Sequence, residues 1–311
     1  MPISLQAAQQ LSQSRLTNFV IDEFRKSALM DLLTFDNTVK PQGGKSLAYV
    51  YNRVKTLPTA AVRAINSEYV PQEADTEQIT VNLKVLGGSF QVDRVLAANE
   101  EGVVDLVQFE LQQKTNATIA LFHDLFINGD SAANAAAFDG LNKALTGSST
   151  ELTPAEVIDL GSSAKIDANW KIFLDHLRKL KARLDGAPGV LLMHREMFAV
   201  FQSVMDRAGI NLSGKDNYGD EALQWGSATV MALGDKPGTS DPIIADTSIY
   251  MARLGLDGLH GVTPEGDTLV KTYLPDMKQP GAVKLGEVEF PCAMALKATR
   301  AAGVLRNVQI G

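Results

Sequence analysis

Four histidines are the side chains that could most readily bind a metal ion in this chain. They are scattered along the sequence, at His123, His176, His194 and His260. A zinc site needs its ligands at short, regular spacings, as in H-E-x-x-H, and the run His194-Arg195-Glu196 lacks that spacing. We therefore expect no metal site and interpret the histidines as solvated or structurally satisfied side chains.

Nucleophilic and nucleotide chemistry also lack a motif. There is no G-x-S-x-G, and the single cysteine, Cys292, lies in an apolar stretch typical of a buried strand and an inert thiol. Gly87-Gly88 and Gly161-Ser162-Ser163 do not have the spacing of a phosphate-binding loop, and both are interpreted as turns. Carboxylates are plentiful, but their spacing cannot locate an acid–base pair. We assign no catalytic, cofactor-binding or metal-binding residue and expect no cofactor.

One basic run is a candidate for binding nucleic acid. It comprises His176, Arg178, Lys179, Lys181 and Arg183. These residues alternate with the apolar positions of one predicted helix, so a solvated helix face is the favoured interpretation.

The composition indicates an ordered protein with an acidic balance. The 311 residues are 45% hydrophobic and 21% charged, with a formal net charge of −7. That charge argues against a protein that clamps phosphate backbones, yet it is compatible with a container for nucleic acid. No apolar run reaches the roughly 18 residues of a membrane span, and the first 15 residues do not read as an export signal. The lone cysteine excludes an internal disulfide and fits a reducing cytoplasm.

Periodicity predicts an N-terminal arm followed by a long hairpin. Helical spacing extends from Leu5 to Leu33, and turn-forming residues follow from Thr34 to Gly44. Strand patterns cover Leu47 to Val54 and Ile79 to Val85, and the polar, proline-containing segment Lys55 to Gln78 lies between them. An isolated two-stranded hairpin is marginal in water, so we expect a neighbouring chain to support it. The alternative is a hairpin that folds back onto its own domain.

The remainder reads as one long helix, a compact α/β unit and a returning β segment. The helix is expected from about Asn99 to Asn128, roughly 40 Å at 1.5 Å per residue. The α/β unit has helices and strands in alternation. Its helices are predicted at Trp170 to Leu184 and Met197 to Met205, and its strands at Val190 to Met193, Thr229 to Leu233, Pro242 to Ala245 and Ser248 to Ala252. Strand character returns from Leu269 to Ile310.

This order of elements, with three stretches of sequence, resembles the major capsid protein family of tailed phages, whose fold is named after phage Hong Kong 97. The first stretch is Val81 to Arg94, similar to the family's return from an extended loop into a long helix. The second is Asn128-Gly129-Asp130 followed by Phe138-Asp139-Gly140-Leu141. The third is Leu174 to Gly209, where helix, strand and helix resemble the family's axial domain. None is a strict motif, and the resemblance rests on their sum.

The resemblance implies an α+β Hong Kong 97-like fold with four parts. They are an N-terminal arm at 1–44, an extended β-hairpin loop at 45–95, a peripheral domain with a long spine helix at 96–148 and 263–311, and an α/β axial domain at 149–262. It also implies a non-enzymatic subunit that forms hexamers and pentamers of an icosahedral shell around double-stranded DNA, which it contacts non-specifically. Portal, scaffolding and decoration proteins are the implied partners. The implied location is the virion, after assembly in the host cytoplasm.

Two alternatives stay open. An encapsulin-type nanocompartment shell shares the fold and encloses cargo enzymes, and a monomeric α/β enzyme would belong to another class. The chain also departs from the family pattern. The arm begins almost at Met1, so a scaffolding segment has been removed or is a separate protein. Lys55 and Lys84 lie in the hairpin, but no asparagine or glutamate matches the family's crosslink, and no crosslinking residue is assigned.

Overall fold

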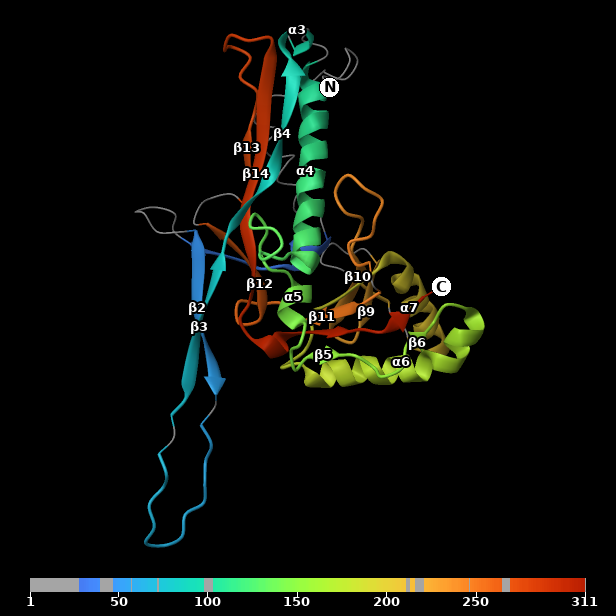
Figure 1. The fold of residues 1–311 in the computed structure, drawn as a ribbon. Coiled ribbons are helices and arrows are strands. Elements are labelled where there is room, and N and C mark those ends of the chain that lie inside the picture. The colour runs from blue at the N-terminus through green and yellow to red at the C-terminus, as the bar shows by residue number, and fades with distance from the viewer. Residues whose placement is uncertain are drawn as a thin grey trace.

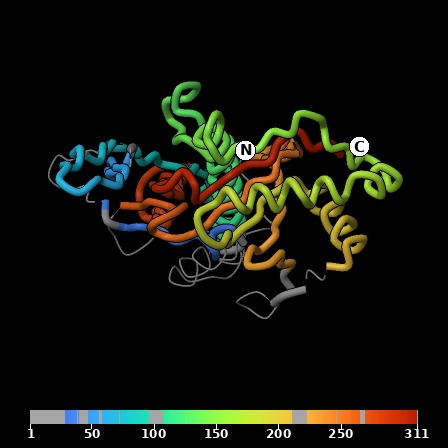
Figure 2. Tube along the Cα trace, turned by 90° about the horizontal axis from the view of Figure 1, so that it is seen from below, coloured from blue at the N-terminus to red at the C-terminus, as the bar shows by residue number. Residues whose placement is uncertain are grey.

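The computed structural model describes residues 28–39, 47–56, 58–71, 73–97, 103–210, 213–215, 221–245, 247–264 and 269–310. Three parts are evident in Figure 1: a long blade at the top, a hairpin that projects downward, and a globular body to one side. Seen from below, the hairpin lies at one end of the molecule and the body at the other (Figure 2). The chain is therefore elongated rather than spherical.

The N-terminal region contributes a helical turn and a strand. The helix predicted from Leu5 to Leu33 lies outside the described residues except for α2 (Ala28–Leu32). The turn predicted from Thr34 to Gly44 is wrong at its start, because β1 (Phe35–Val39) forms there and pairs in parallel with β12 (Leu259–Pro264). The Phe35 ring lies so close to Gly261 that a Cβ there would be 2.3 Å from it. Long-range packing overrides the local turn propensity.

The predicted hairpin is confirmed. Strands β2 (Ala48–Thr56) and β3 (Asp75–Asn82) pair antiparallel, from Ala48 opposite Asn82 to Thr56 opposite Asp75. Between the strands, every described residue from 58 to 71 is exposed. The alternative in which the hairpin folds back onto its own domain is wrong, since the hairpin extends away from the body (Figure 1).

The blade is built on the long strand β14 (Val283–Leu296). It pairs with β4 (Lys84–Asp93) over most of its length and with β12 at its C-terminal end. The short β13 (Lys271–Tyr273) pairs with its middle. The predicted long helix is confirmed as α4 (Val103–Asn128), 26 residues and about 39 Å long. It packs on β4 and β14. The short helix α3 (Arg94–Ala97) precedes it.

Aromatic rings fill the space between α4 and the sheet. Phe122 on α4 lies 5.5 Å from Phe290 on β14 and 6.1 Å from Phe35 on β1, measured between ring centroids. The side chains of Phe122 and Phe290 are both fully buried. This cluster ties the N-terminal strand, the helix and the C-terminal strand into one core.

The turn predicted at Gly87-Gly88 is wrong, because both glycines lie inside β4. A Cβ on Gly87 would lie 1.9 Å from the carbonyl oxygen of Val288 on the paired strand. The glycine therefore permits a close approach of two strands rather than a change of direction.

The body is a seven-stranded sheet in the order β5-β15-β11-β7-β10-β9-β8. These strands are β5 (Glu151–Leu152), β7 (Val190–Met193), β8 (Ser213–Lys215), β9 (Glu221–Trp225), β10 (Ala228–Ala232), β11 (Ile249–Ala252) and β15 (Ala302–Leu305). The predicted strands at 190–193, 229–233 and 248–252 are confirmed. The one at Pro242 to Ala245 is wrong: Pro242 makes only an isolated bridge to Asp235, since proline has no N–H for a ladder.

Two amphipathic helices pack against this sheet, as predicted. They are α6 (Ser163–Arg183) and α7 (Arg195–Ala208), and α6 begins earlier than expected because Ser162 caps it through a bond from the Lys165 N–H. A small sheet of β6 (Ile158–Asp159) and β16 (Val308–Gln309) lies beside α6. The division into arm, loop, peripheral and axial domains stays a prediction. The body sheet includes β15, which belongs to the C-terminal segment.

Candidate assembly surfaces

An arginine fastens the root of the hairpin to the end of β14. The Arg53 Nη2 donates to the Leu296 carbonyl at 2.6 Å, and its Nε donates to the Lys297 carbonyl at 2.9 Å. The same guanidinium lies 3.3 Å from the Thr299 hydroxyl. A planar group with several donors holds two carbonyls at fixed directions. The hairpin therefore leaves the body at a defined angle.

Two tyrosines on the same strand face reinforce the root. The Tyr51 hydroxyl also donates to the Leu296 carbonyl, at 2.9 Å, and the Tyr49 hydroxyl donates to Asp36 on β1 at 2.7 Å. The Lys297 ammonium lies 5.3 Å from the Tyr49 ring centroid. Burial, together with the bond to Asp36, raises the pKa of Tyr49, so it stays a neutral donor. Tyr49, Tyr51 and Arg53 are called the hairpin root below.

A groove of about 350 Å³ lies beside this root. Its walls come from three segments distant in sequence: the hairpin strands, the loop after α4, and the end of β14. They include Tyr51, Arg53, Lys84, Phe138 and Leu296. Arg53 and Lys84 in this lining both donate to backbone carbonyls. We interpret the groove as the space left where the hairpin joins the end of β14.

The hairpin tip, residues 58–71, is ordered within itself but does not pack on the body. The Ser67 N–H and hydroxyl both donate to the Ala64 carbonyl, at 3.2 and 2.8 Å, and Asn66 has a positive φ of 69°. The Arg63 guanidinium lies 5.5 Å from the Tyr69 ring centroid. This turn presents Ile65 near its apex. The tip is a small preformed surface.

The tip exposes large apolar side chains almost fully. Val62 is 101% exposed, Ile65 91% and Val70 80%. Clustered exposure of this kind is unusual in a self-contained domain and marks contact surfaces. The hairpin tip is therefore a candidate contact surface.

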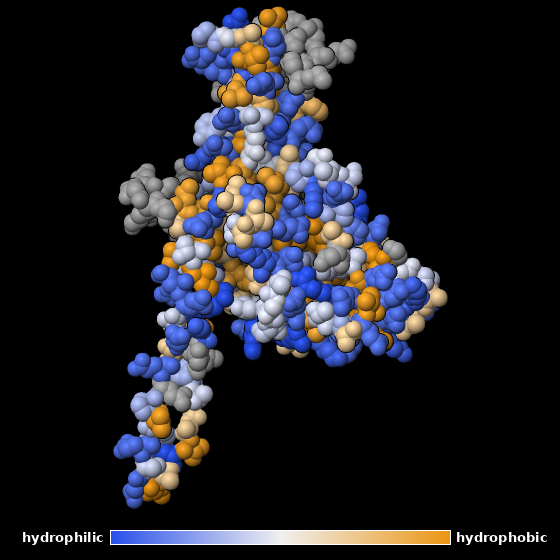
Figure 3. Space-filling view, in the orientation of Figure 1, coloured by the Kyte–Doolittle hydropathy of each residue, from blue (hydrophilic) through white to orange (hydrophobic). Residues whose placement is uncertain are grey.

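A second group of exposed apolar side chains lies on the blade. Its members project from β13 and β14 on the sheet face away from α4, and they are Tyr273, Val283 and Leu285, each about half exposed. Figure 3 shows hydrophobic atoms at both ends of the molecule, on the tip and on the upper blade. One chain thus carries two apolar surfaces at opposite ends of one long ribbon.

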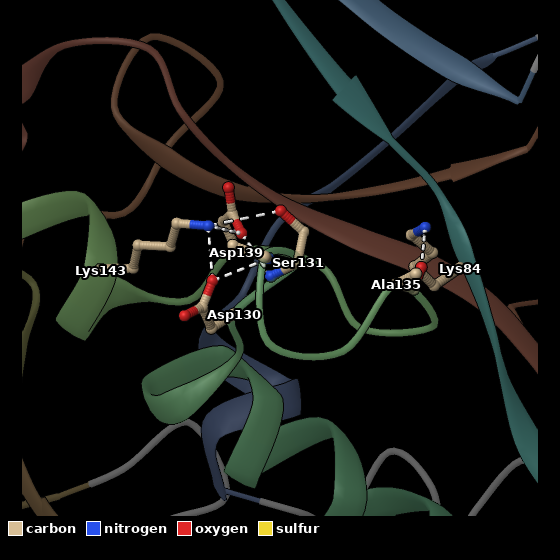
Figure 4. A network of polar contacts seen from close by, with 7 residues as sticks. Lys84, Asp130, Ser131, Ala135, Asp139 and Lys143 are labelled. Atoms are coloured by element: carbon tan, nitrogen blue, oxygen red, sulfur yellow. Dashed lines mark hydrogen bonds and ion pairs between the residues drawn. The ribbon is translucent and has the colours of Figure 1, made fainter.

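The loop after α4 is closed by a lysine between two aspartates. The Lys143 Nζ lies 2.6 Å from Asp130 Oδ1 and 2.9 Å from Asp139 Oδ1, and the Ser131 N–H donates to Asp139 at 2.7 Å (Figure 4). The bond from Lys143 lowers the pKa of Asp130, and its bonds to the two carboxylates raise the pKa of Lys143. Nearby, Lys84 on β4 donates to the Ala135 carbonyl at 2.5 Å. These contacts hold the loop closed, and the cluster is called the clasp below.

Two glycines bring the ends of that loop together. The Gly140 N–H donates to the Gly129 carbonyl at 2.8 Å. A Cβ on Gly129 would lie 2.2 Å from the Phe138 carbonyl oxygen, and one on Gly140 would lie 2.5 Å from that of Leu125. The stretches Asn128-Gly129-Asp130 and Phe138-Asp139-Gly140-Leu141, on which the resemblance partly rests, therefore meet in space. They end α4 and direct the chain into α5 (Leu141–Leu145).

The chemically reactive side chains considered from the sequence are not brought together. Within the described ranges, no three histidine, cysteine, aspartate or glutamate side chains could hold a metal ion. Burial raises the pKa of the Cys292 thiol, and burial lowers the pKa of His123 to about 4. His260 is fully buried at the hairpin root. The absence of catalytic residues stays a prediction.

The basic run on α6 is largely engaged in local contacts. Lys179 pairs with Asp175 at 2.6 Å, the Lys181 ammonium lies 5.3 Å from the Trp225 ring centroid, and Arg183 donates to the Glu151 carbonyl. These contacts agree with a solvated helix face. In the part of the chain that the structure describes, no helix is long and apolar enough to span a membrane.

The sequence did not nominate the arginine and tyrosines of the root. Their signal was present as an alternation, because Tyr49, Tyr51 and Arg53 occupy one face of a strand. The acceptors of Tyr51 and Arg53, at Leu296 and Lys297, are more than 240 residues away in sequence. Local patterns could not identify those partners.

Comparison of the sequence with known proteins finds no matching family model and no matching curated protein. Solved structures do match. The SrpI encapsulin complex from Synechococcus elongatus has 18% identity and a TM-score of 0.60, covering 90% of this chain and 87% of that one. A structure of Gordonia phage Cozz has 12% identity and a TM-score of 0.53, covering 99% and 91%. The virus-like particle from Pyrococcus furiosus has 11% identity and a TM-score of 0.55, covering 94% and 99%.

These matches span nearly the whole chain on both sides, and most of the structural neighbours come from phage and other capsids. At such low identity they establish architecture alone. The chain has the α+β fold of Hong Kong 97-type capsid proteins, as its resemblance to that family predicted.

Proposed function

We propose that this chain is the major capsid protein of a tailed double-stranded DNA phage. It self-assembles through hexamers and pentamers into an icosahedral shell around the genome and catalyses no reaction. The observation that carries the proposal is the hairpin: its root is fixed to the body by Arg53, while its tip exposes Val62 and Ile65. A projection that is rigid at its base and apolar at its end is suited to contact a neighbouring copy.

The position of the two apolar surfaces supports self-assembly. The tip and the blade lie at opposite ends of the molecule (Figure 1). Contacts between two different surfaces of identical chains are heterologous, and they build rings or extended lattices rather than isolated dimers. Repetition of tip-to-neighbour contacts would bury each tip once per copy and would give a ring, such as a hexamer or a pentamer, when the rotation closes.

The implied partners follow from that role. Packaged DNA is contacted non-specifically, because a net charge of −7 disfavours tight binding of phosphates. A portal and separate scaffolding or decoration proteins complete the particle. The subunit assembles in the host cytoplasm and resides in the virion, without a cofactor.

An encapsulin-type nanocompartment is the second candidate, and the similarity to the SrpI encapsulin complex favours it. The two roles differ in contents: portal and DNA indicate the phage, and a bound cargo-targeting peptide indicates the compartment. The acidic residues at the base of the tip, Glu73, Asp75 and Glu77, belong to a long hairpin that favours the phage.

The test is deletion of Pro58 to Glu77, with Val62→Asp/Ile65→Asp as a milder variant. Both should leave the subunit folded, because the tip and the end of β3 that the deletion also removes, Asp75 to Glu77, are exposed. Both should abolish assembly in sizing and negative-stain imaging. Val157→Asp, at a valine on the body that is 56% exposed, is the matched control and should assemble normally. Intact shells from the deletion variant would refute the intersubunit role of the hairpin.

A further inference from the structure

One buried histidine at the hairpin root has no hydrogen-bond partner among the described residues. His260 lies on β12 and is 0% exposed. Neither ring nitrogen meets the geometry of a hydrogen bond to a described protein group, although the nearby backbone of Gly258 and Gly255 favours a proton on the ring. Buried polar groups in native proteins are nearly always satisfied, so an orphaned imidazole requires an explanation.

The ring packs directly on the hairpin. Its centroid lies 5.7 Å from that of Tyr49 on β2, with the rings nearly perpendicular. The same tyrosine donates to Asp36 and carries Lys297 over its ring. His260 therefore touches the residue through which β1, β2 and the end of β14 meet.

The charged groups around His260 come from the elements packed against it. Lys297, just after β14, disfavours a proton on the imidazole, and Asp36 on β1 favours one. Tyr49 is the titratable group on β2, and burial keeps it neutral. Asp257, on the loop before β12, is already paired with Arg253 at 2.6 Å. The net environment suits a neutral ring.

We propose that His260 is a proton-sensitive latch, which holds the hairpin root against the body when neutral and releases it when protonated. A buried imidazolium would repel Lys297 from the Tyr49 ring and would compete with the Tyr49 hydroxyl for Asp36. Because Tyr49 is the contact between the hairpin and β1, its displacement loosens the direction in which the hairpin leaves the body. The latch itself does not depend on the proposed function; only its consequence, acid control of the assembly contact, rests on that function.

The pH window follows from the direction of the shift. Burial and then the Lys297 charge hold the pKa of His260 below its ordinary value of 6.5. A loosened root exposes the ring and returns its pKa toward that value. The neutral ring therefore contributes its full stability to the closed root above the ordinary pKa. This contribution is lost as pH falls from the ordinary pKa toward the lowered pKa of the closed state, and the equilibrium constant for opening then rises by up to about tenfold per pH unit.

Hydrogen exchange of the β2 and β3 amides in the full-length chain tests the latch, with rates corrected for intrinsic pH dependence. In the wild type, opening of these amides should rise by up to about tenfold between about pH 7.5 and 5.5, relative to those of the body strands β7 and β11. His260→Phe keeps an aromatic ring beside Tyr49 and should remove the rise. His176→Gln, at a partly buried histidine on α6 in the body, is the matched control and should retain it.

Lys297→Met provides a second measurement if His260→Phe does not fold. Loss of the ammonium raises the pKa of His260 in the closed state. The increase in opening from about pH 7.5 to 5.5, measured for each protein relative to its own value at the higher pH, should therefore be smaller in Lys297→Met than in the wild type. A wild-type rise that persists in His260→Phe, or an absent rise in the wild type, would overturn the latch. Exchange is read in any oligomeric state, whereas sizing of the same samples reports assembly, so failure of the latch and failure of the capsid role are distinguishable.

Discussion

The Arg53 guanidinium on β2 and the Leu296 carbonyl at the end of β14 form a hydrogen bond of 2.6 Å that joins positions 243 residues apart. It fixes the projecting hairpin to the strand that runs the length of the blade. The direction of the hairpin is therefore a property of the folded subunit and exists before any neighbour binds.

Replacement of Arg53 should release the hairpin root without unfolding the body. Arg53→Gln removes charge-assisted bonds to two carbonyls, and we expect a loss of about 1.5–3 kcal/mol in the free energy of unfolding. Arg53→Lys should restore part of this, because one ammonium cannot reproduce the fork of the guanidinium. Denaturant unfolding followed by circular dichroism measures both. Arg63→Gln, in the exposed tip, is the control and should stay within about 0.5 kcal/mol; an equal loss there would contradict the anchoring role.

Gly129 should tolerate no side chain. Gly129→Ala places a Cβ 2.2 Å from the Phe138 carbonyl oxygen, so the loop that ends α4 must open, and we expect a loss of several kcal/mol. Gly234→Ala is the matched control, because no atom lies within 4 Å of its added Cβ. Thermal unfolding of the two variants compares them directly. Similar melting temperatures would show that the clasp after α4 is dispensable.

Sequence periodicity predicts the elements whose stability is local. The long helix α4, the strand β3 and the helices α6 and α7 were each predicted from the pattern of their own residues, and all four are confirmed. The prediction failed where a distant segment decides the conformation. Gly87 is in a strand because Val288 approaches it, and Phe35 is in a strand because β12 offers an edge.

The same distinction between local and distant causes applies to the candidate surfaces. The tip could be predicted, because its prolines, its acidic residues and the strands on either side lie in one continuous segment. The root could not, because Tyr51 and Arg53 find their acceptors in a loop close to the other end of the chain. Likewise, nothing in the sequence around His260 indicates that its ring packs on Tyr49.

The contact between Glu151 and Arg306 should make the junction of α5 and the body sheet sensitive to acid. Burial would raise the pKa of Glu151, but the Gly147 N–H and the Arg306 guanidinium outweigh burial and hold the pKa below its ordinary 4.5. Since the folded-state pKa is the lower one, the carboxylate contributes stability above the ordinary value, and that contribution is lost as pH falls through the folded value.

Glu151→Gln should therefore be less stable than the wild type at neutral pH, and the difference should shrink below about pH 4.5. Urea unfolding at a series of pH values measures this difference. Glu156→Gln, at an exposed position nearby, is the control and should show no such convergence. A difference that is constant across the series would contradict the ionic contribution of Glu151.

Electron microscopy of the purified full-length chain, after sizing under a range of salt and protein concentrations, tests the central claim most directly. The account predicts capsomers, closed shells or tubes in which each hairpin tip contacts a neighbouring subunit. A strictly monomeric species under every assembly condition would contradict it.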